Sequence, residues 1–195
     1  MDIAFVLGNG VSRRGLPLHD MSKHGTMYGC NGLHRDFTPD VLVATDTPIA
    51  THIESIGYPL ENKFYTRRPT PGKGALEIPR PYFGFSSGPV AVGLAANNRH
   101  RKIYMIGFDM GPVEGKKFNN LYAGTEFYKK PDSPPTYTGN WTKQIKHICE
   151  EFPELKFIRV CGPTTARLPE LDSIKNLGHL PLQGFIELLN KQKDF

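Results

Sequence analysis

The sequence predicts one α/β domain with a Rossmann-like architecture, in which a mostly parallel, doubly wound sheet carries helices on both faces. Apolar segments rich in β-formers alternate with helical or loop segments, as in parallel sheets that are covered on both sides. The first apolar segment ends in a glycine-rich turn, as the first strand of such a sheet commonly does. The chain has 195 residues, enough for one well-buried core but not for two comfortable domains. We therefore expect residues 1–195 to form a single nucleotide-binding domain.

Six apolar segments have the length and composition of buried strands. They are residues 3–7, 26–30, 41–45, 63–66, 102–107 and 156–160. Prolines and glycines predict irregular loops at 67–81 and 131–135. Long loops at the ends of a parallel sheet are where ligands usually bind.

Three segments are predicted to be helices. Residues 87–98 place Pro89 in the first turn, where its missing N–H costs nothing. Residues 140–152 carry apolar side chains at steps of three and four, with Asn140 well placed as the N-cap. Residues 185–190 form a shorter helix near the end of the chain.

The first strand runs into the turn Gly8-Asn9-Gly10-Val11-Ser12. Glycines at the end of a buried strand let backbone N–H groups approach a phosphate or a ribose, because no Cβ holds the ligand away. An ordinary glycine-rich turn of an α/β domain is the alternative. Ser12-Arg13 stands where the dinucleotide fingerprint requires its third glycine, so the pattern argues against an NAD site.

The composition narrows the class of protein. The formal net charge of +5 favours an anionic partner such as a nucleotide, a nucleic acid or an acidic glycan. The three cysteines are widely spaced and the seven histidines lack metal-ligand spacing, so neither a disulfide framework nor a metal site is indicated. No apolar stretch has the length of a membrane span, and the N-terminus lacks the features of a signal peptide. We expect a soluble, cytoplasmic protein without a metal or other cofactor.

Further polar motifs stand at positions expected at the ligand-binding edge of the sheet. Asn31 is suited to a base edge or a ribose hydroxyl, or to an ordinary Asn-Gly turn. Asp46 is suited to binding a ribose, acting as a base or capping a helix. Ser86-Ser87-Gly88 is suited to an anion site at a helix N-terminus, with a simple N-cap as the alternative. Asp109 is suited to acting as a general base, with a loop cap or a salt bridge to a nearby lysine as the alternatives. We expect one pocket to be formed by Gly8, Asn9, Gly10, Asn31, Ser86, Ser87 and Gly88.

The order of these motifs carries a family resemblance. The motifs are Gly8-Asn9-Gly10-x-Ser12, Cys30-Asn31, Ser86-Ser87-Gly88, Ile106-Gly107-Phe108-Asp109 and Tyr122-Ala123. Taken together over roughly residues 3–160, they resemble the bacterial sialyltransferases of glycosyltransferase family 42. The chain is also similar to proteins of marine tailed phages, in which Ser-Ser-Gly-Pro and Tyr-x-Gly-Asn-Trp segments recur.

The resemblance implies a metal-independent transferase of Rossmann-like fold, whose substrate is a nucleotide-activated sugar. It implies that Tyr122 donates a hydrogen bond to the departing phosphate. The residues that it assigns to the nucleotide, together with the glycine turn, are Gly8, Asn9, Gly10, Ser12, Asn31, Ser86, Ser87 and Gly88.

Three positions depart from the family pattern. Asn140 stands where the family has a general-base histidine, and asparagine takes no proton at neutral pH. The second phosphate-binding tyrosine has no counterpart in residues 110–112, and Asp46 replaces an asparagine that contacts the nucleotide. We therefore expect Asp46 or Asp109 to serve as the base, which requires that burial raise the pKa of its carboxyl group.

Three functions follow as hypotheses. The first is a glycosyltransferase with a small or glycan acceptor. The second is a glycosyltransferase that modifies bases in phage DNA, with basic pairs such as Arg67-Arg68 and Lys129-Lys130 on the phosphates. The third is a non-catalytic nucleotide-binding or virion-associated protein, since fold does not fix activity. A phage-encoded protein would act in the host cytoplasm, and self-association into a homo-oligomer is open in each case.

Overall fold

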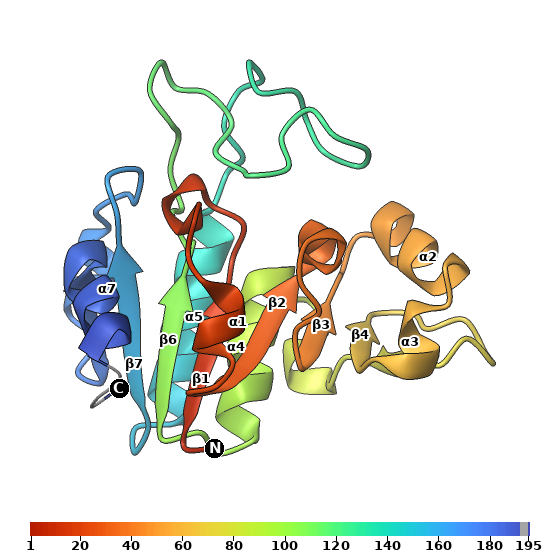
Figure 1. Ribbon diagram of the computed structural model, residues 1–195, viewed down its shortest axis with the longest axis horizontal. Helices are drawn as coiled ribbons and strands as arrows, with labels where there is room; N and C mark the ends of the chain where they lie inside the picture. Colours follow the sequence, from red (N-terminus) through yellow and green to blue (C-terminus); the bar gives the residue numbers. More distant parts are fainter. Residues whose placement is uncertain (192–194) are drawn as a thin grey trace.

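The computed structural model describes residues 1–191 and 195. Within these residues, eight parallel strands form one sheet in the order β5-β4-β3-β2-β1-β6-β7-β8 (Figure 1). The strands are β1 (Ile3–Leu7), β2 (Thr26–Cys30), β3 (Val41–Val43), β4 (Phe64–Thr66), β5 (Leu76–Glu77), β6 (Lys102–Ile106), β7 (Lys156–Cys161) and β8 (Leu177–Pro181). The predicted α/β class is confirmed, and every pairing between these strands is parallel.

The strand order reverses at β1, which determines where a ligand can bind. Phe5 of β1 is paired with Met27 of β2 on one side and with Tyr104 of β6 on the other. The chain therefore builds the sheet outward from β1 in one direction and, starting with β6, in the other. In open α/β sheets a crevice opens at such a point, outside the carboxyl ends of the strands.

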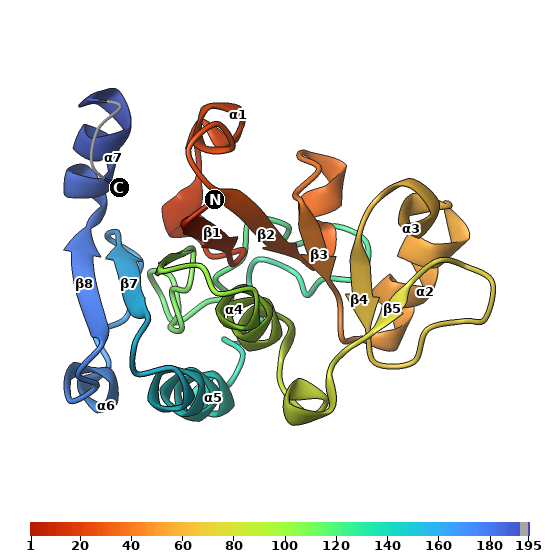
Figure 2. The ribbon, with the colours of Figure 1, turned by 90° about the horizontal axis from the view of Figure 1, so that it is seen from below.

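Helices cover both faces of the sheet (Figure 2). One face carries η3 (Arg80–Tyr82), α4 (Ser87–Asn97), α5 (Gly139–Glu151) and α6 (Pro169–Asp172). The other carries α1 (Leu18–Met21), η2 (Asn31–Arg35), α2 (Thr47–Ser55), α3 (Tyr58–Glu61) and α7 (Leu182–Lys191). Successive side chains of β1 alternate between the two cores, with Ala4 and Val6 in one and Phe5 and Leu7 in the other.

The predicted segments and the observed elements differ mainly at the edges of the sheet. β5 is two exposed residues inside the loop predicted at 67–81, too short to give a periodic signal. β8 has both buried and exposed positions and contains glycine and proline, so it forms no continuous apolar run and was not predicted from the sequence. Helix α5 has Thr138 rather than Asn140 at its N-cap, because the helix already begins at Gly139.

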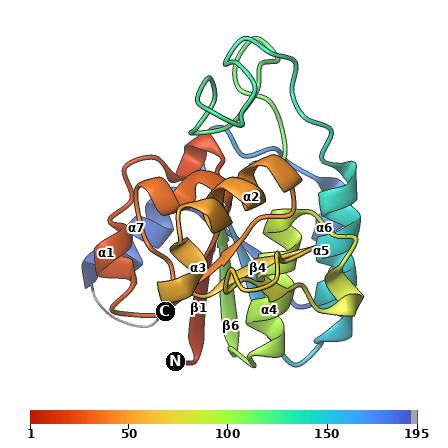
Figure 3. The same cartoon turned by 90° about the vertical axis from the view of Figure 1, so that its right-hand side faces the viewer.

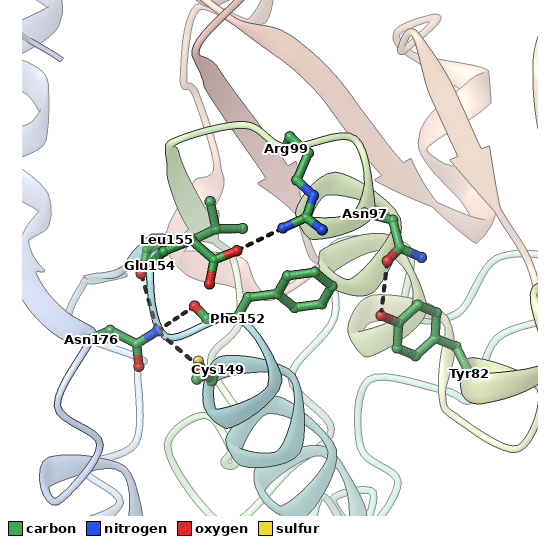
Figure 4. A network of polar contacts seen from close by, with 8 residues as sticks. All are labelled: Tyr82, Asn97, Arg99, Cys149, Phe152, Glu154, Leu155 and Asn176. Atoms are coloured by element: carbon green, nitrogen blue, oxygen red, sulfur yellow. Dashed lines mark hydrogen bonds and ion pairs between the residues drawn. The ribbon is translucent and has the colours of Figure 1, made fainter.

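The end of the sheet where the strands begin is closed by local hydrogen bonds. Asn176 donates from Nδ2 to the carbonyl oxygens of Cys149 (2.9 Å), Phe152 (2.9 Å) and Leu155 (3.0 Å) (Figure 4). These carbonyls belong to the last turn of α5 and the turn that follows it, where a helix leaves acceptors unpaired. One side chain thus anchors the connection from α5 to β7.

The opposite end of the sheet is covered by a long loop, residues 111–138, which we call the covering loop. It rises above the carboxyl ends of the strands in both Figure 1 and Figure 3. The backbone is left-handed at Lys116 (φ 54°) and at Phe127 (φ 71°), a conformation that side chains other than glycine rarely adopt. Separately, no helix of the described residues has both the length and the apolar character of a membrane span.

Candidate functional site

A pocket of about 330 Å³ lies under the covering loop at the carboxyl ends of the strands. This volume falls within the range of small-molecule sites. Five of the residues predicted for the site line it, namely Asn9, Gly10, Asn31, Asp46 and Asp109. Gly8, Ser12, Ser86, Ser87, Gly88 and Tyr122 are not among its lining residues. A larger hollow of about 480 Å³, beside His19 and Asp40, is lined by none of the predicted residues.

The glycines of the first turn permit a close approach between two backbones. A Cβ at Gly8 would lie 2.6 Å from the carbonyl oxygen of Gly107, and one at Gly10 would lie 2.6 Å from Asp109 Oδ2. The backbone N–H of Gly10 donates to the Gly107 oxygen at 2.9 Å. The turns after β1 and β6 are therefore in direct contact and form the floor of the pocket at the point where the strand order reverses.

Asp109 joins three loops through its carboxylate. Oδ2 accepts hydrogen bonds from the backbone N–H of Ser12 (3.0 Å), Thr164 Oγ1 (2.8 Å) and Asn119 Nδ2 (3.1 Å). Oδ1 accepts bonds from the hydroxyls of Ser12 and Thr165. The side chain is 3% exposed, and five donors occupy its two oxygens. A carboxylate held in this way positions the loops around it rather than collecting a proton from a substrate.

A second buried network ties the covering loop to the first turn. The guanidinium of Arg13 donates to Gly8 O (2.7 Å), Asn9 Oδ1 (2.9 Å) and the hydroxyl of Tyr122 (3.2 Å). The Tyr122 hydroxyl in turn donates to Asp36 Oδ2 at 2.6 Å. Burial raises the pKa of Tyr122 to about 12, so this proton stays in place at neutral pH. The Tyr122 hydroxyl is therefore engaged within this network, and Tyr122 is not among the residues that line the pocket.

The predicted Ser86–Gly88 turn packs elements together next to the pocket. Ser87 Oγ accepts a hydrogen bond from the Thr45 N–H (3.0 Å) and donates to Asn31 Oδ1 (3.3 Å). Gly88 lies against the ring of Trp141, since a Cβ there would come within 2.6 Å of it. Asn31 and Ser87, 56 residues apart in sequence, are thus brought together as expected. Of this group, Asn31 reaches the pocket itself.

Asp46 is the accessible acid of the pocket. It is exposed, so the burial that we expected of the base is not found at this residue. Asp46 precedes α2 as its N-cap residue, but its side chain makes no capping hydrogen bond. The N-terminal end of a helix stabilises a carboxylate. Across the described residues, no basic side chain forms an ion pair with it. The carboxylate is consequently available to a ligand at the β3 end of the pocket.

Lys129 is the basic residue that lines the pocket. Its Nζ lies 3.2 Å from Thr136 Oγ1 and 5.5 Å from the centre of the Phe118 ring. The covering loop is fixed at the end of β1, because the N–H of Leu121 donates to Asn9 O at 2.8 Å. The pocket is therefore lined by one exposed carboxylate, Asp46, and by one exposed ammonium group, Lys129.

Several lining residues were not among the predicted site residues, and most of them come from the covering loop. They include Phe118, Asn119, Phe127, Tyr128 and Lys129, together with Trp141 of α5. The Tyr128 hydroxyl accepts a hydrogen bond from the N–H of Gly32 at 2.8 Å, and burial raises the pKa of Tyr128 to about 12. Its proton remains available for donation to a ligand. The length of this loop in the sequence could have indicated a binding segment, but it does not predict which of its side chains line the pocket.

The pocket has no cluster suited to a metal. Within residues 1–191 and 195, no three or more His, Cys, Asp or Glu side chains are grouped so as to hold an ion. Comparison with protein family models, with curated proteins and with solved structures finds no match to this chain.

Proposed function

We propose that this chain is a glycosyltransferase that moves a sugar from a nucleotide donor to a hydroxyl group, with Asp46 as the general base. The observation that carries the proposal is that one pocket holds both a free carboxylate and a lysine. Asp46, which makes no capping bond, and Lys129 line the pocket together with Gly10 of the close-packed turn after β1, where doubly wound sheets bind nucleotides. The family resemblance of the sequence motifs supports the same class of reaction.

The two exposed charged side chains of the pocket, Asp46 and Lys129, suit the two halves of the transfer. The acceptor hydroxyl gives its proton to the carboxylate of Asp46 while its oxygen bonds to the anomeric carbon of the donor. The bond from that carbon to the phosphate oxygen breaks, and the nucleotide leaves with the electron pair. The ammonium group of Lys129 offsets the charge that develops on the leaving phosphate.

The other polar residues take supporting roles in this scheme. Tyr128 rather than Tyr122 donates a hydrogen bond into the pocket, because the Tyr122 hydroxyl already donates to Asp36. Asn31 offers its Nδ2 amide to the ligand while Oδ1 is held by Ser87. Asp109 is a positioning residue that fixes the turns on which Gly10 and Asn119 stand.

The test begins with thermal shifts in the presence of CMP, UMP, GMP, AMP and the matching sugar nucleotides, followed by a donor-hydrolysis assay with and without EDTA. Asp46→Asn should lower kcat by about 10²–10⁴-fold and leave nucleotide affinity unchanged. Lys129→Met should weaken nucleotide binding by about tenfold, the equivalent of one ion pair of moderate strength. Asp132→Asn, an exposed carboxylate of the covering loop that does not line the pocket, is the matched control and should change neither quantity.

Three results would overturn the proposal or part of it. Nucleotide binding without hydrolysis or transfer would identify a binding protein instead of an enzyme. Undiminished turnover in Asp46→Asn would exclude this residue as the base. Loss of turnover on adding EDTA would exclude a scheme in which Lys129 alone balances the charge of the leaving group.

A further inference from the structure

Phe127 is an exposed aromatic residue held in a strained backbone conformation at the edge of the pocket. Its φ is 71°, in the left-handed region, and its side chain is 39% exposed although it lines the pocket. The left-handed conformation costs a residue with a Cβ free energy that glycine does not pay. Such strain persists where the surrounding structure imposes it, and it is found preferentially at functional sites.

The neighbouring contacts hold the Phe127 ring against α2 in the pocket that Asp46 also lines. The ring centre lies 5.2 Å from that of His52, which is in the last turn of α2, whereas Asp46 is the N-cap at the other end of this helix. On the other side, the guanidinium of Arg35 donates to the carbonyl oxygen of Glu126 (2.8 Å) and to Thr125 Oγ1 (2.8 Å). The backbone directly before Phe127 is thus fixed to η2, while the ring itself remains open to solvent and to the pocket.

We infer that Phe127 is the stacking platform for the acceptor, and that the acceptor is a pyranose ring; this inference rests on the proposed function. An aromatic face and a free carboxylate in the same pocket suit a ring that is apolar on one side and carries hydroxyl groups at its edge. The apolar side stacks on Phe127, and one hydroxyl reaches Asp46. Asp46 is the exposed carboxylate in the lining of this pocket, so it can accept a hydrogen bond from a hydroxyl group of a neutral sugar.

The test uses Phe127→Gly, with Lys116→Gly as the matched control. Lys116 is also left-handed (φ 54°) and exposed on the covering loop, but it does not line the pocket. Both variants remove the same backbone strain and add the same freedom to the unfolded chain. Because more than half of the Phe127 side chain is covered, Phe127→Gly should have a Tm several degrees below that of Lys116→Gly, so binding is compared at a temperature at which both variants are folded.

Binding is measured by ligand-observed NMR with methyl β-D-galactopyranoside, methyl β-D-glucopyranoside and thymidine, and separately with the nucleotides of the preceding test. The inference requires that a pyranoside bind the wild type and Lys116→Gly equally, and Phe127→Gly about tenfold more weakly, with nucleotide affinity unchanged.

The remaining outcomes separate this inference from the proposed function. Pyranoside binding that depends on Phe127, without any nucleotide binding, would uphold the sugar platform and refute the transferase. Nucleotide binding with pyranoside affinity equal in Phe127→Gly and wild type would overturn the platform alone. Binding of thymidine in place of the pyranosides, lost in Phe127→Gly, would replace the sugar acceptor by a nucleobase and also overturn the inference. Absence of all binding would refute both.

Discussion

The two ends of the parallel sheet differ in how their polar groups are paired. At the end where the strands begin, the side chains form closed local networks, such as Asn176 on the last turn of α5 and the ion pair Arg99–Glu154 at 2.6 Å (Figure 4). At the carboxyl end, the fully hydrogen-bonded Asp109 lines the same pocket as Asp46, which makes no capping bond. Polar side chains at the first end are hydrogen-bonded to one another or to the backbone. The second end combines hydrogen-bonded groups in the floor of the pocket with exposed side chains that have few partners.

The number of hydrogen bonds that each polar residue makes at the carboxyl end separates residues that stabilise the fold from residues that are free to contact a ligand. Asp109 and Arg13 are charged and buried, but their hydrogen bonds join segments that are far apart in sequence. Removing either leaves several buried partners unsatisfied, which is costly. Asp46 and Lys129 are exposed and have few partners within the described residues, so their removal should affect ligands more than folding.

The largest expected effect on stability comes from Asp109→Asn, which tests whether the floor depends on this carboxylate. In the wild type, the Ser12 N–H and Thr164 Oγ1 donate to a carboxylate oxygen of Asp109. In the variant an NH2 group replaces one of the two oxygens, so donors to that oxygen face another donor. We expect a loss of about 3–5 kcal/mol in the free energy of unfolding, because at least two buried donors lose their acceptor. Urea denaturation monitored by circular dichroism measures it.

Asp20→Asn is the control for this change. Asp20 forms an ion pair with Lys23 at 2.7 Å, but its side chain is 66% exposed. Exposed pairs of this kind contribute little, so we expect no measurable change in the denaturation midpoint. If Asp109→Asn unfolds like the wild type and loses only turnover, Asp109 acts in the chemistry and the distinction drawn above is wrong.

The fold was largely predictable from local patterns, whereas the contacts of the site were not. Buried strands such as β1 and β2 are continuous apolar runs, so their ranges match the prediction. The role of Asp109 depends on donors 97 and 55 residues away, at Ser12 and Thr164. No local pattern encodes such pairings.

The turn at Gly8 is a second case in which the sequence did not predict the contact that the residue makes. The absence of a Cβ at Gly8 indicated a close approach but did not say to what. In the structure the approaching group is the backbone of Gly107, itself left-handed with φ 74°. A ligand-binding turn and a contact between two turns thus share one sequence pattern.

Gly8→Ala should have the next largest effect on stability. It tests whether the turns after β1 and β6 must be in contact. The new methyl group would lie 2.6 Å from the Gly107 oxygen, and both are attached to backbone that cannot simply rotate away. We expect a loss of about 1–3 kcal/mol, typical of overpacking at a tight site. Gly178→Ala in the edge strand β8 is the control, because a Cβ there meets no atom within 4 Å. Equal denaturation midpoints for the two variants would show that the turns can separate without cost.

The smallest effect concerns pH at the other end of the sheet and depends on His100. Nδ1 of His100 lies 2.7 Å from the carbonyl oxygen of Met1, which only accepts, so Nδ1 carries the hydrogen. Nε2 of the neutral ring then accepts from the Tyr28 hydroxyl at 2.8 Å, and Asn98 Nδ2 donates to that hydroxyl at 2.7 Å. Protonation of Nε2 would remove the acceptor of the hydrogen bond from the Tyr28 hydroxyl.

Burial lowers the pKa of His100 below its ordinary 6.5, and His34 and His179 are lowered by burial in the same direction. Because the unfolded chain then binds more protons than the folded one, stability is full above pH 6.5 and falls as the pH drops from 6.5 towards the folded pKa values. Thermal unfolding between pH 8 and pH 5 should therefore show a falling Tm, and His100→Gln should reduce that slope without abolishing it, since the other two histidines still contribute. An NMR titration of the His100 ring protons provides the direct check. A folded-state pKa at or above 6.5, or equal slopes in wild type and His100→Gln, would show that this end of the sheet tolerates the charge and that its polar network is less closed than the structure indicates.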